Sequence, residues 1–189
     1  MKKILFLLLG IILITTGCSS NYLKGKVNVE IDVKDYGIIS LELDADTAPI
    51  TVTNFVNLVN EGFYDGLTFH RIIDGFMIQG GDPKHDGTGN SKQVIKGEFV
   101  NNGVENDISH VRGVISMARG SYSNDSASCQ FFIVHEDSPH LNGDYAAFGH
   151  VTKGMDIVDR IVKDAVVEDD NGTVLFENQP VITSIRVVE

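Results

Sequence analysis

A stretch of fourteen residues, Phe69–Asp82, constrains the fold of this chain more than any other segment. It reads FHRIIDGFMIQGGD and brings an arginine, an aromatic ring, a thioether and a carboxamide together around the dipeptide Asp74-Gly75. An Asp-Gly pair between two apolar runs is a strong signal for the tight turn of a β-hairpin. We therefore expect two short antiparallel strands that turn at this dipeptide.

The side chains of the two strands can be assigned to faces, because successive residues of a strand point to opposite sides. On the first strand, Arg71 is expected to share a face with Phe69 and Ile73. On the second strand, Met77 and Gln79 are expected to share a face. An arginine placed among apolar side chains is not an ordinary surface charge, so the hairpin is a candidate functional element.

The other apolar patterns predict short strands and two helices. Val27–Val33 alternates apolar and polar residues, as a half-buried strand does. Further strands are expected over Ile38–Leu43, Val94–Phe99, Val114–Ala118, Gln130–Val134, Ala147–Val151 and the segment after Pro180. One helix is expected to begin near Pro49 and to end at Gly62, and a second to cover about Met155–Lys163. This pattern favours a closed antiparallel barrel, although strand content alone does not separate a barrel from a sandwich.

The N-terminus has the layout of a bacterial export signal. Lys2 and Lys3 precede the apolar run Ile4–Ile14, which is too short to span a bilayer. The next residues, Thr-Thr-Gly-Cys ending at Cys18, resemble a lipoprotein box, in which the cysteine is acylated and becomes the mature N-terminus. The alternative is an ordinary signal peptide, or an uncleaved anchor, in which this cysteine is incidental.

These features divide the chain into three parts. Residues 1–17 are expected to be a signal peptide, residues 18–25 a lipidated cysteine with a short tether, and residues 26–189 one folded domain. A chain of this length can hold a single domain with a sizeable core. The expected location is the extracytoplasmic side of the cell membrane, with attachment through the lipid.

The formal net charge of −11 argues against several kinds of partner. Loss of Lys2 and Lys3 with the signal peptide would make the domain more acidic still. Nucleic-acid phosphates and anionic lipid head groups would repel such a domain, so membrane attachment must come from the lipid. With Cys18 acylated, Cys129 has no partner for an internal disulfide.

Other kinds of chemistry find little support. The six histidines show no HExxH pattern and no pairing with cysteine, so we expect no metal and no cofactor. The glycine-rich loop 80–90 is not followed by a helix, as a phosphate-binding loop would require. Ser126 and Ser128 lie near His135 in the sequence, but the absence of a G-x-S-x-G elbow argues against hydrolysis.

The hairpin stretch closely resembles the signature of the cyclophilins, a family of peptidyl-prolyl cis/trans isomerases. Four further blocks resemble cyclophilin segments in the family's order: KGEF (Lys96–Phe99), HVRGVISMAR (His110–Arg119), SASCQFFIV (Ser126–Val134) and HLNGDYAAFGHV (His140–Val151). The similarity covers about residues 27–188. It implies a mainly β fold, namely a closed eight-stranded antiparallel β-barrel capped by two α-helices. It also implies an enzyme that accelerates rotation about X-Pro peptide bonds.

The resemblance assigns roles to individual residues. Arg71 matches the catalytic arginine, and Gln79 and Phe76 belong to the same catalytic group. The matching substrate-binding residues are Met77, Gly87, Ala118, Arg119, Gly120, Gln130, Phe132, His140, Leu141 and Tyr145. Within these sets, the proline pocket is matched by Phe76, Met77, Phe132 and Leu141, and the segment along the bound peptide by Ala118, Arg119 and Gly120. Gln79 and Gln130 match polar residues that position the substrate carbonyl and the arginine.

Taken singly, the same residues have plainer explanations. An arginine in an acidic chain is often paired with a carboxylate, and an apolar strand residue usually belongs to the core. Phe131-Phe132 shows both possibilities side by side. Adjacent strand residues face opposite ways, so one ring can fill the core while the other lines a groove.

Two positions depart from the family pattern. His140 stands where many eukaryotic members have a tryptophan on the pocket rim, and Tyr145 holds a position often occupied by histidine. Both side chains can still donate hydrogen bonds. Binding of the drug cyclosporin, which uses that tryptophan, is expected to be weaker here.

The sequence therefore favours a monomeric, lipid-anchored prolyl isomerase that acts on proline-containing peptides and assists the folding of exported proteins. The alternative is a non-catalytic module that grips proline-containing segments at the cell surface, as a holdase or adhesin. Binding alone would not require Arg71. A solute-binding lipoprotein is a third option, but the chain lacks the length for two lobes around a cleft.

Overall fold

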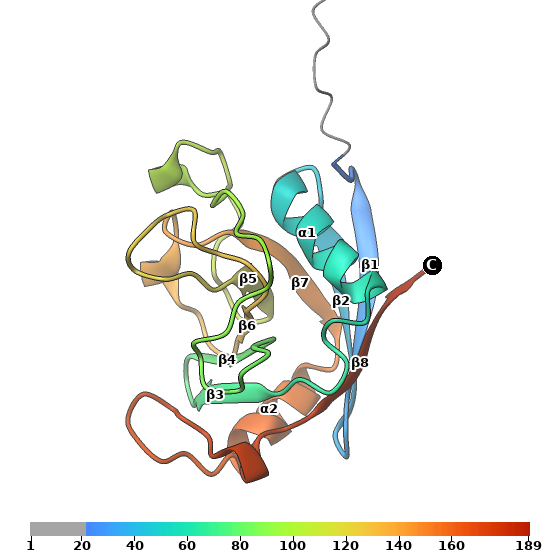
Figure 1. Cartoon of the computed structure of the whole chain (residues 1–189), viewed down its shortest axis with the longest axis vertical. Coiled ribbons are helices and arrows are strands. Elements are labelled where there is room, and N and C mark those ends of the chain that lie inside the picture. Colours follow the sequence, from blue (N-terminus) through green and yellow to red (C-terminus); the bar gives the residue numbers. More distant parts are fainter. Residues whose placement is uncertain (1–21) are drawn as a thin grey trace, which may run out of the picture.

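The computed structural model describes residues 22–189, which form one antiparallel sheet of eight strands with two helices. The sheet curls around an apolar core, with α1 near one end and α2 near the other (Figure 1). Its strand order is β3-β4-β6-β5-β7-β2-β1-β8. The strands are β1 Lys26–Val33, β2 Gly37–Asp44, β3 Phe69–Ile73, β4 Met77–Gly80, β5 Val114–Met117, β6 Phe131–Val134, β7 Ala147–Lys153 and β8 Ile182–Val188. The helices are α1 Pro49–Asn60 and α2 Met155–Asp164, and short 3-10 turns occur at η1 Val100–Asn102, η2 Pro139–Leu141 and η3 Phe176–Asn178.

Both expected helices are confirmed. Helix α1 begins at Pro49, where the missing N–H of proline costs nothing, and it packs against β2 and β8. Helix α2 packs against β2 and buries Val158, Ile161 and Val162. Within residues 22–189, neither helix is long and apolar enough to cross a membrane.

The strands form an open, curled half-barrel, and the expectation of a closed barrel was wrong in this respect. The end strands β3 and β8 meet only near their starts, at a single bridge between Thr68 and Val181. Further along β3, Arg71 pairs with Thr173 in a second isolated bridge. The chain between Thr173 and Val181, which includes η3, does not pair with β3. Pro180, at the entry to β8, has no N–H to donate to a ladder. The seam is therefore made by two separate segments and not by one continuous strand pair.

The strand expected over Val94–Phe99 is also absent from the sheet. Only Ile95 pairs with another segment, through an isolated bridge to Ala127. The N–H of Gly97 donates to the carboxylate of Asp125 at 3.0 Å. A side chain therefore uses a backbone donor that a strand ladder would need, and the segment runs as an irregular connection.

The next residue, Glu98, explains why this segment is fixed without being a strand. Its side chain is buried, with 2 % of its surface exposed, and reaches the first turn of α1. Its two oxygens accept the N–H of Ile50 at 3.0 Å, the N–H of Thr51 at 2.7 Å and the hydroxyl of Thr51 at 2.7 Å. Ala48, at the N-cap position of α1, offers no side-chain acceptor. A residue almost fifty positions away thus caps this helix.

Two apolar clusters lie on the two faces of the sheet. The larger fills the interior and includes Phe69, Ile78 and the fully buried Phe131. The smaller lies outside β4, β5, β6 and β7 and consists of Met77, Val114, Phe132, Val134, Leu141 and Ala147. The expectation for the adjacent phenylalanines is confirmed: Phe131 belongs to the core and Phe132 to the outer cluster.

The start of the domain lies slightly earlier than the sequence suggested. The N–H of Leu23 donates to Thr53 Oγ1 at 2.8 Å, and the N–H of Gly25 donates to Asp46 Oδ1 at 2.8 Å. Both residues had been placed in the tether, but they are held against the domain. The expected signal peptide and Cys18 lie outside the described residues.

Glu98→Ala should lower the free energy of unfolding by about 2–3 kcal/mol, because the buried N–H of Thr51 and the partly buried N–H of Ile50 would lose their acceptor. Glu98→Gln should cost less, since its carbonyl oxygen can still accept one of these hydrogen bonds. Urea denaturation would measure both variants. Glu61→Gln, an exposed change beyond the C-terminal end of the same helix, serves as the control. Equal stability of Glu98→Ala and the wild type would contradict the capping role.

Candidate active site

A β-bulge at His70 sets the direction of the candidate catalytic arginine. Phe69 pairs with Gly80 and Arg71 pairs with Gln79. These two partners are adjacent on β4, whereas Phe69 and Arg71 have one extra residue, His70, between them on β3. Phe69 is fully buried in the core, whereas Arg71 points to the outer face beside Gln79. The expectation that Arg71 shares a face with Phe69 was therefore wrong, because the extra residue breaks the alternation.

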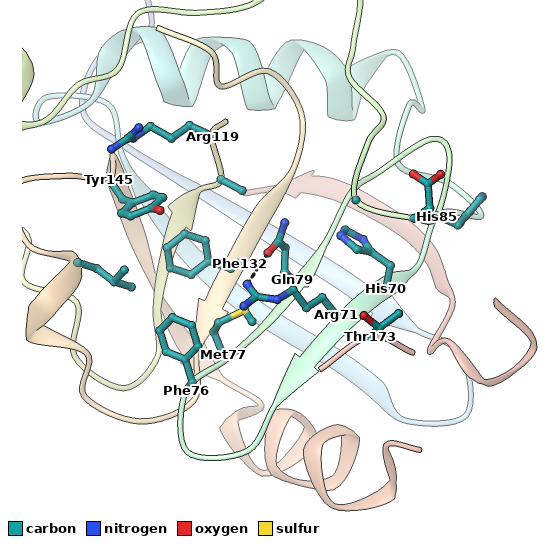
Figure 2. A pocket seen from close by; sticks show the side chains of 14 residues that line it. His70, Arg71, Phe76, Met77, Gln79, His85, Arg119, Phe132, Tyr145 and Thr173 are labelled. Atoms are coloured by element: carbon teal, nitrogen blue, oxygen red, sulfur yellow. Dashed lines mark hydrogen bonds between the residues drawn. The ribbon is translucent and has the colours of Figure 1, made fainter. Parts of the chain in front are cut away.

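The outer face carries a pocket of about 340 Å³ (Figure 2). Its lining residues are His70, Arg71, Phe76, Met77, Gln79, His85, Asp86, Gly87, Ala118, Arg119, Phe132, Leu141, Tyr145 and Thr173. A second hollow of about 210 Å³ shares Gln79, Gly87, Ala118 and Arg119 with it and adds Gly120 and Gln130. All the residues predicted for the site, except His140, line one of the two hollows. The exposed His140 packs its ring on Phe76, with centroids 5.4 Å apart.

One half of the pocket is apolar. Figure 2 shows Phe76, Met77 and Phe132 grouped on one side of Arg71. Met77 and Phe132 are almost completely buried, with 1 % and 4 % of their surfaces exposed, and form the floor. The ring of Tyr145 meets that of Phe132 edge to face at 5.8 Å. This half excludes water and has the shape and chemistry to hold a small apolar ring.

Arg71 borders this apolar half and is fixed by neutral groups. Its Nε donates to the carbonyl oxygen of Asn171 at 2.8 Å, and its Nη1 donates to Gln79 Oε1 at 3.2 Å. Within residues 22–189 no carboxylate lies within 4 Å of its guanidinium. Burial lowers the pKa of Arg71, while Tyr145 and Asp169 act in the opposite direction. The explanation of a structural arginine paired with an acid is thus not supported.

A directed chain of amides holds Gln79 in turn. Gln130 Nε2 donates to the carbonyl oxygens of Gly87 at 3.1 Å and Gly89 at 2.8 Å, so its Oε1 must face Gln79. Gln79 Nε2 donates to this oxygen at 2.9 Å, and its own Oε1 is left to accept from Arg71. The chain fixes the orientation of both amides and links the loop of Gly87 to the guanidinium.

Arg119 has a structural side chain. Its Nε donates to the carbonyl oxygen of Asp144 at 2.8 Å, and its guanidinium carbon lies 5.0 Å from the ring centre of Tyr145 and 5.3 Å from that of Phe99. These contacts brace the wall of the pocket. They leave the backbone of Ala118 to Gly120 as the part of this segment that a peptide could follow.

Sequence reasoning missed the side of the pocket beyond Arg71. His70, His85, Asp86 and Thr173 line it, and Asn171 orients the arginine. Asn171 ends the acidic segment Glu168–Asn171. Its contact with Arg71 spans a hundred residues, and no local pattern in the sequence signals it. Within the described chain, no three histidine, cysteine or acidic side chains are grouped as metal ligands would be.

Beneath the floor lies a buried histidine with a defined tautomer. His110 stacks on Phe132, with centroids 6.0 Å apart and planes 18° apart. The backbone N–H of His110 donates to Asn142 Oδ1 at 2.8 Å, so this atom is an oxygen and the ring Nδ1, 3.0 Å away, must carry a hydrogen. Nε2 is then the acceptor for the hydroxyl of Ser116 at 3.0 Å. Burial lowers the pKa of His110, and the same cause lowers the pKa of His70.

Comparison with known proteins agrees with this geometry. The profile of the family described as cyclophilin type peptidyl-prolyl cis-trans isomerase/CLD matches residues 27–187. Peptidyl-prolyl cis-trans isomerase B of Bacillus subtilis is 44 % identical over 137 residues, covering 72 % of this chain and 92 % of that protein. A peptidyl-prolyl cis-trans isomerase of Helicobacter pylori is 43 % identical over 134 residues, covering 70 % and 78 %.

Solved structures show the same fold. A Cryptosporidium parvum cyclophilin type isomerase, crystallised in the presence of the dipeptide Ala-Pro, superposes with a TM-score of 0.75 at 28 % identity. The match covers 86 % of this chain and 99 % of that one. This chain belongs to the cyclophilin family, and it is a cyclophilin-type peptidyl-prolyl cis-trans isomerase.

Acid should destabilise the protein through its buried neutral histidines. The unfolded chain binds a proton at His110 near pH 6.5, whereas the folded chain, with its lowered pKa, does not. Stability is therefore complete above this pH and is lost as the pH falls toward the folded pKa, by at most about 1.4 kcal/mol per pH unit for each histidine. Urea denaturation between pH 7.5 and 5.5 should show a shallower decline for His110→Gln than for the wild type. His150→Gln, at an exposed position of β7, should keep the wild-type slope; equal slopes in all three proteins would refute the assignment.

Proposed function

We propose that the pocket isomerises X-Pro bonds with the proline ring on the floor formed by Phe132 and Met77 and with Arg71 as the catalytic donor. The observation that carries this proposal is the guanidinium of Arg71, which borders an apolar pocket and, within the described part of the chain, is fixed without a carboxylate partner. Gln79 and Gln130 orient it, and Phe76 forms a wall of the pocket.

The chemistry needs no nucleophile and no metal. Rotation about the peptide bond is opposed by a barrier of about 18–20 kcal/mol that arises from amide conjugation. As the bond twists, the nitrogen regains a lone pair that can accept a hydrogen bond. A donor held ready for this nitrogen stabilises the twisted state more than either planar state, and only such a difference raises the rate.

The arrangement around Arg71 meets this requirement. Two of its nitrogen atoms are used by Asn171 and Gln79, and these bonds hold the plane of the guanidinium. Among the described residues, Nη2 has no hydrogen-bond partner and is free to donate to a substrate. Partial burial strengthens such a bond, because the local dielectric is lower than that of water.

The backbone of Ala118–Gly120 is proposed to lie along the bound peptide, between the two hollows. Gly87 faces it from the opposite loop, and His140, Leu141 and Tyr145 complete the rim and wall. A structure of a related isomerase in the presence of Ala-Pro supports an X-Pro segment as the ligand. We propose that the protein acts as a monomer.

The non-catalytic alternative has no observation in its favour. A holdase or adhesin needs only an apolar groove, and the outer apolar cluster around Met77 and Phe132 would provide one. It does not need the chain of amides that orients Arg71. The relatives matched over most of their length are named as isomerases.

We also propose that the protein is anchored by a lipid on Cys18, on the extracytoplasmic side of the membrane, and assists the folding of exported proteins. The support is the sequence Lys-Lys, apolar run, Gly-Cys. Leu23 is already held against the domain, so only four residues would separate Cys18 from it. The five steps from Cys18 to Leu23 span at most about 18 Å when extended, which would keep the domain close to the bilayer surface.

Arg71→Ala should reduce kcat/KM by roughly 10²–10³-fold, or about 3–4 kcal/mol, with little loss of peptide affinity. The reason is that its hydrogen bond to the amide nitrogen forms only as the bond twists. Arg71→Lys should recover little activity, because an ammonium lacks the fixed fork of donors. Phe132→Ala should behave differently and weaken binding as well as rate.

NMR exchange on an Ala-Pro peptide, a peptide titration and a thermal melt would separate these effects. Arg160→Ala on α2, which does not line the pocket, is the matched control and should act as the wild type. Near-wild-type rates for Arg71→Ala would end the catalytic assignment, and a loss of folding would show that this arginine is structural.

Metabolic labelling with a fatty-acid probe should tag the wild-type chain in a bacterial host but not Cys18→Ser. The second cysteine provides the control, because Cys129 is completely buried and Cys129→Ser should be labelled as the wild type is. Equal labelling of wild type and Cys18→Ser would remove the lipoprotein assignment without affecting the isomerase assignment.

A further inference from the structure

A second buried histidine lies outside the pocket, behind the turn of the β3–β4 hairpin. His135 follows directly after β6, and 8 % of its surface is exposed. Its ring lies among Gly75 and Asp74 of the turn and Asp159 of α2. None of these four residues lines the pocket, and the mechanism proposed above does not use them.

The contacts of His135 define its protonation state. The backbone N–H of Gly75 donates to its Nδ1 at 3.1 Å, so Nδ1 must carry a lone pair. The ring hydrogen is therefore on Nε2, which lies 3.2 Å from Asp159 Oδ1. This tautomer is the opposite of that of His110, in which Nδ1 carries the hydrogen.

The carboxylate of Asp159 is itself held in place. Arg112 Nη2 lies 2.7 Å and 2.8 Å from its two oxygens, and Arg112 Nη1 donates to the carbonyl oxygen of His135 at 2.7 Å. The three side chains thus form a closed set of contacts between α2, the segment before β5 and the end of β6. The carboxylate that Arg112 holds thus lies against one nitrogen of the His135 ring, at 3.2 Å, and restrains the ring.

His135 holds the turn at two successive residues. Besides the contact to Gly75, its backbone N–H donates to the carbonyl oxygen of Phe76 at 2.8 Å. The turn is also held by its own hydrogen bond, from the N–H of Phe76 to the carbonyl oxygen of Ile73 at 3.1 Å, while the side chain of Asp74 is 87 % exposed. The ring of Phe76 is a wall of the pocket, and Met77 of the floor follows it. The ring acceptor of His135 therefore holds Gly75, the residue directly before this wall, and adds to the backbone contacts of Phe76.

We propose that neutral His135 is a positioning residue of the isomerase: through Gly75 and Phe76 it sets the aromatic wall against which the proline ring is held. The proposal rests on the role proposed for Phe76 above. It has a consequence for pH, because a protonated Nδ1 cannot accept the N–H of Gly75. It would instead donate toward Asp74 Oδ1, 3.5 Å away.

The charged groups around the ring act in different directions. Asp74 from the turn and Asp159 from α2 both favour the protonated ring, and Arg112 opposes it. Acid should therefore exchange the Gly75 contact for the Asp74 contact and shift the wall.

Two substitutions separate positioning from mere packing. His135→Asn retains an oxygen near the place of Nδ1 that can accept the N–H of Gly75, but it cannot take up a proton as a histidine ring can. His135→Leu fills similar space without an acceptor. At pH 7.5, His135→Leu should lower kcat/KM about tenfold, since displacement of a catalytic wall by about 1 Å can cost up to ~10²-fold. His135→Asn should stay within about threefold of the wild type.

The pH profile of the full-length chain, measured by NMR exchange on an Ala-Pro peptide, provides the second readout. Between pH 7.5 and 5.5 the wild-type kcat/KM should fall more steeply than that of His135→Asn. The amide resonance of Gly75 should titrate in the wild type and not in His135→Asn. His150→Asn, an exposed histidine on β7, should retain the wild-type profile and serves as the matched control.

The outcomes are decisive in either direction. Full activity of His135→Leu, or equal losses in the Leu and Asn variants, would overturn the positioning role. If the amide resonance of Gly75 in the wild type did not shift with pH, the proposed exchange of the Gly75 contact for the Asp74 contact would be wrong. This measurement uses the wild type and so does not require His135→Leu to fold. Arg71→Ala in the same assay tests the proposed function separately. The loss of activity expected for this variant follows from the missing guanidinium and does not depend on the protonation of His135.

Discussion

The bulge at His70 decides where the polar chemistry of this protein lies. The interior of the curled sheet is apolar, and an arginine buried there without a partner would cost several kcal/mol. Regular alternation would have placed Phe69 and Arg71 on the same face of the sheet. Either Arg71 would then point into the core, or Phe69 would point out of it. One extra residue on β3 removes this conflict. The pairing of Arg71 with Gln79, and through it the whole site, follows from that register.

Among residues 22–189, the guanidinium of Arg71 has no counterion within 4 Å, although the chain has a large excess of acidic residues. Two neutral acceptors, the carbonyl of Asn171 and the amide of Gln79, fix the guanidinium and leave its charge uncompensated. A carboxylate in either place would bind more strongly and compete with an amide nitrogen, which is a weak acceptor. The chain of amides back to Gly87 gives the required rigidity from neutral hydrogen bonds alone.

The parts of the structure that could be predicted are those encoded locally. The hairpin turn, both helices and the division between Phe131 and Phe132 follow from patterns a few residues long. The bulge was missed because it depends on which residue of β4 faces which residue of β3, and no turn signal reports a register shift. The strand expected at Val94–Phe99 failed because Glu98 serves a distant helix. The open seam and the contact of Asn171 with Arg71 likewise depend on pairings across the whole chain.

An isomerase must hold the proline ring still while one flanking amide turns, so its pocket needs a fixed part and an adjustable part. Here the floor, Phe132 and Met77, belongs to strands inside the sheet. The walls belong to short segments: Phe76 to the hairpin turn and Leu141 to η2. Each wall is attached by a buried neutral histidine, the turn through His135 and η2 through the contact of His110 with Asn142. A proton on Nδ1 of His135 would remove the acceptor for the turn, whereas His110 already carries a hydrogen on Nδ1 and would keep its contact with Asn142. The ladder hydrogen bonds beneath the floor contain no titratable group. The hairpin turn is therefore the part of the site whose attachment depends on the protonation of one ring.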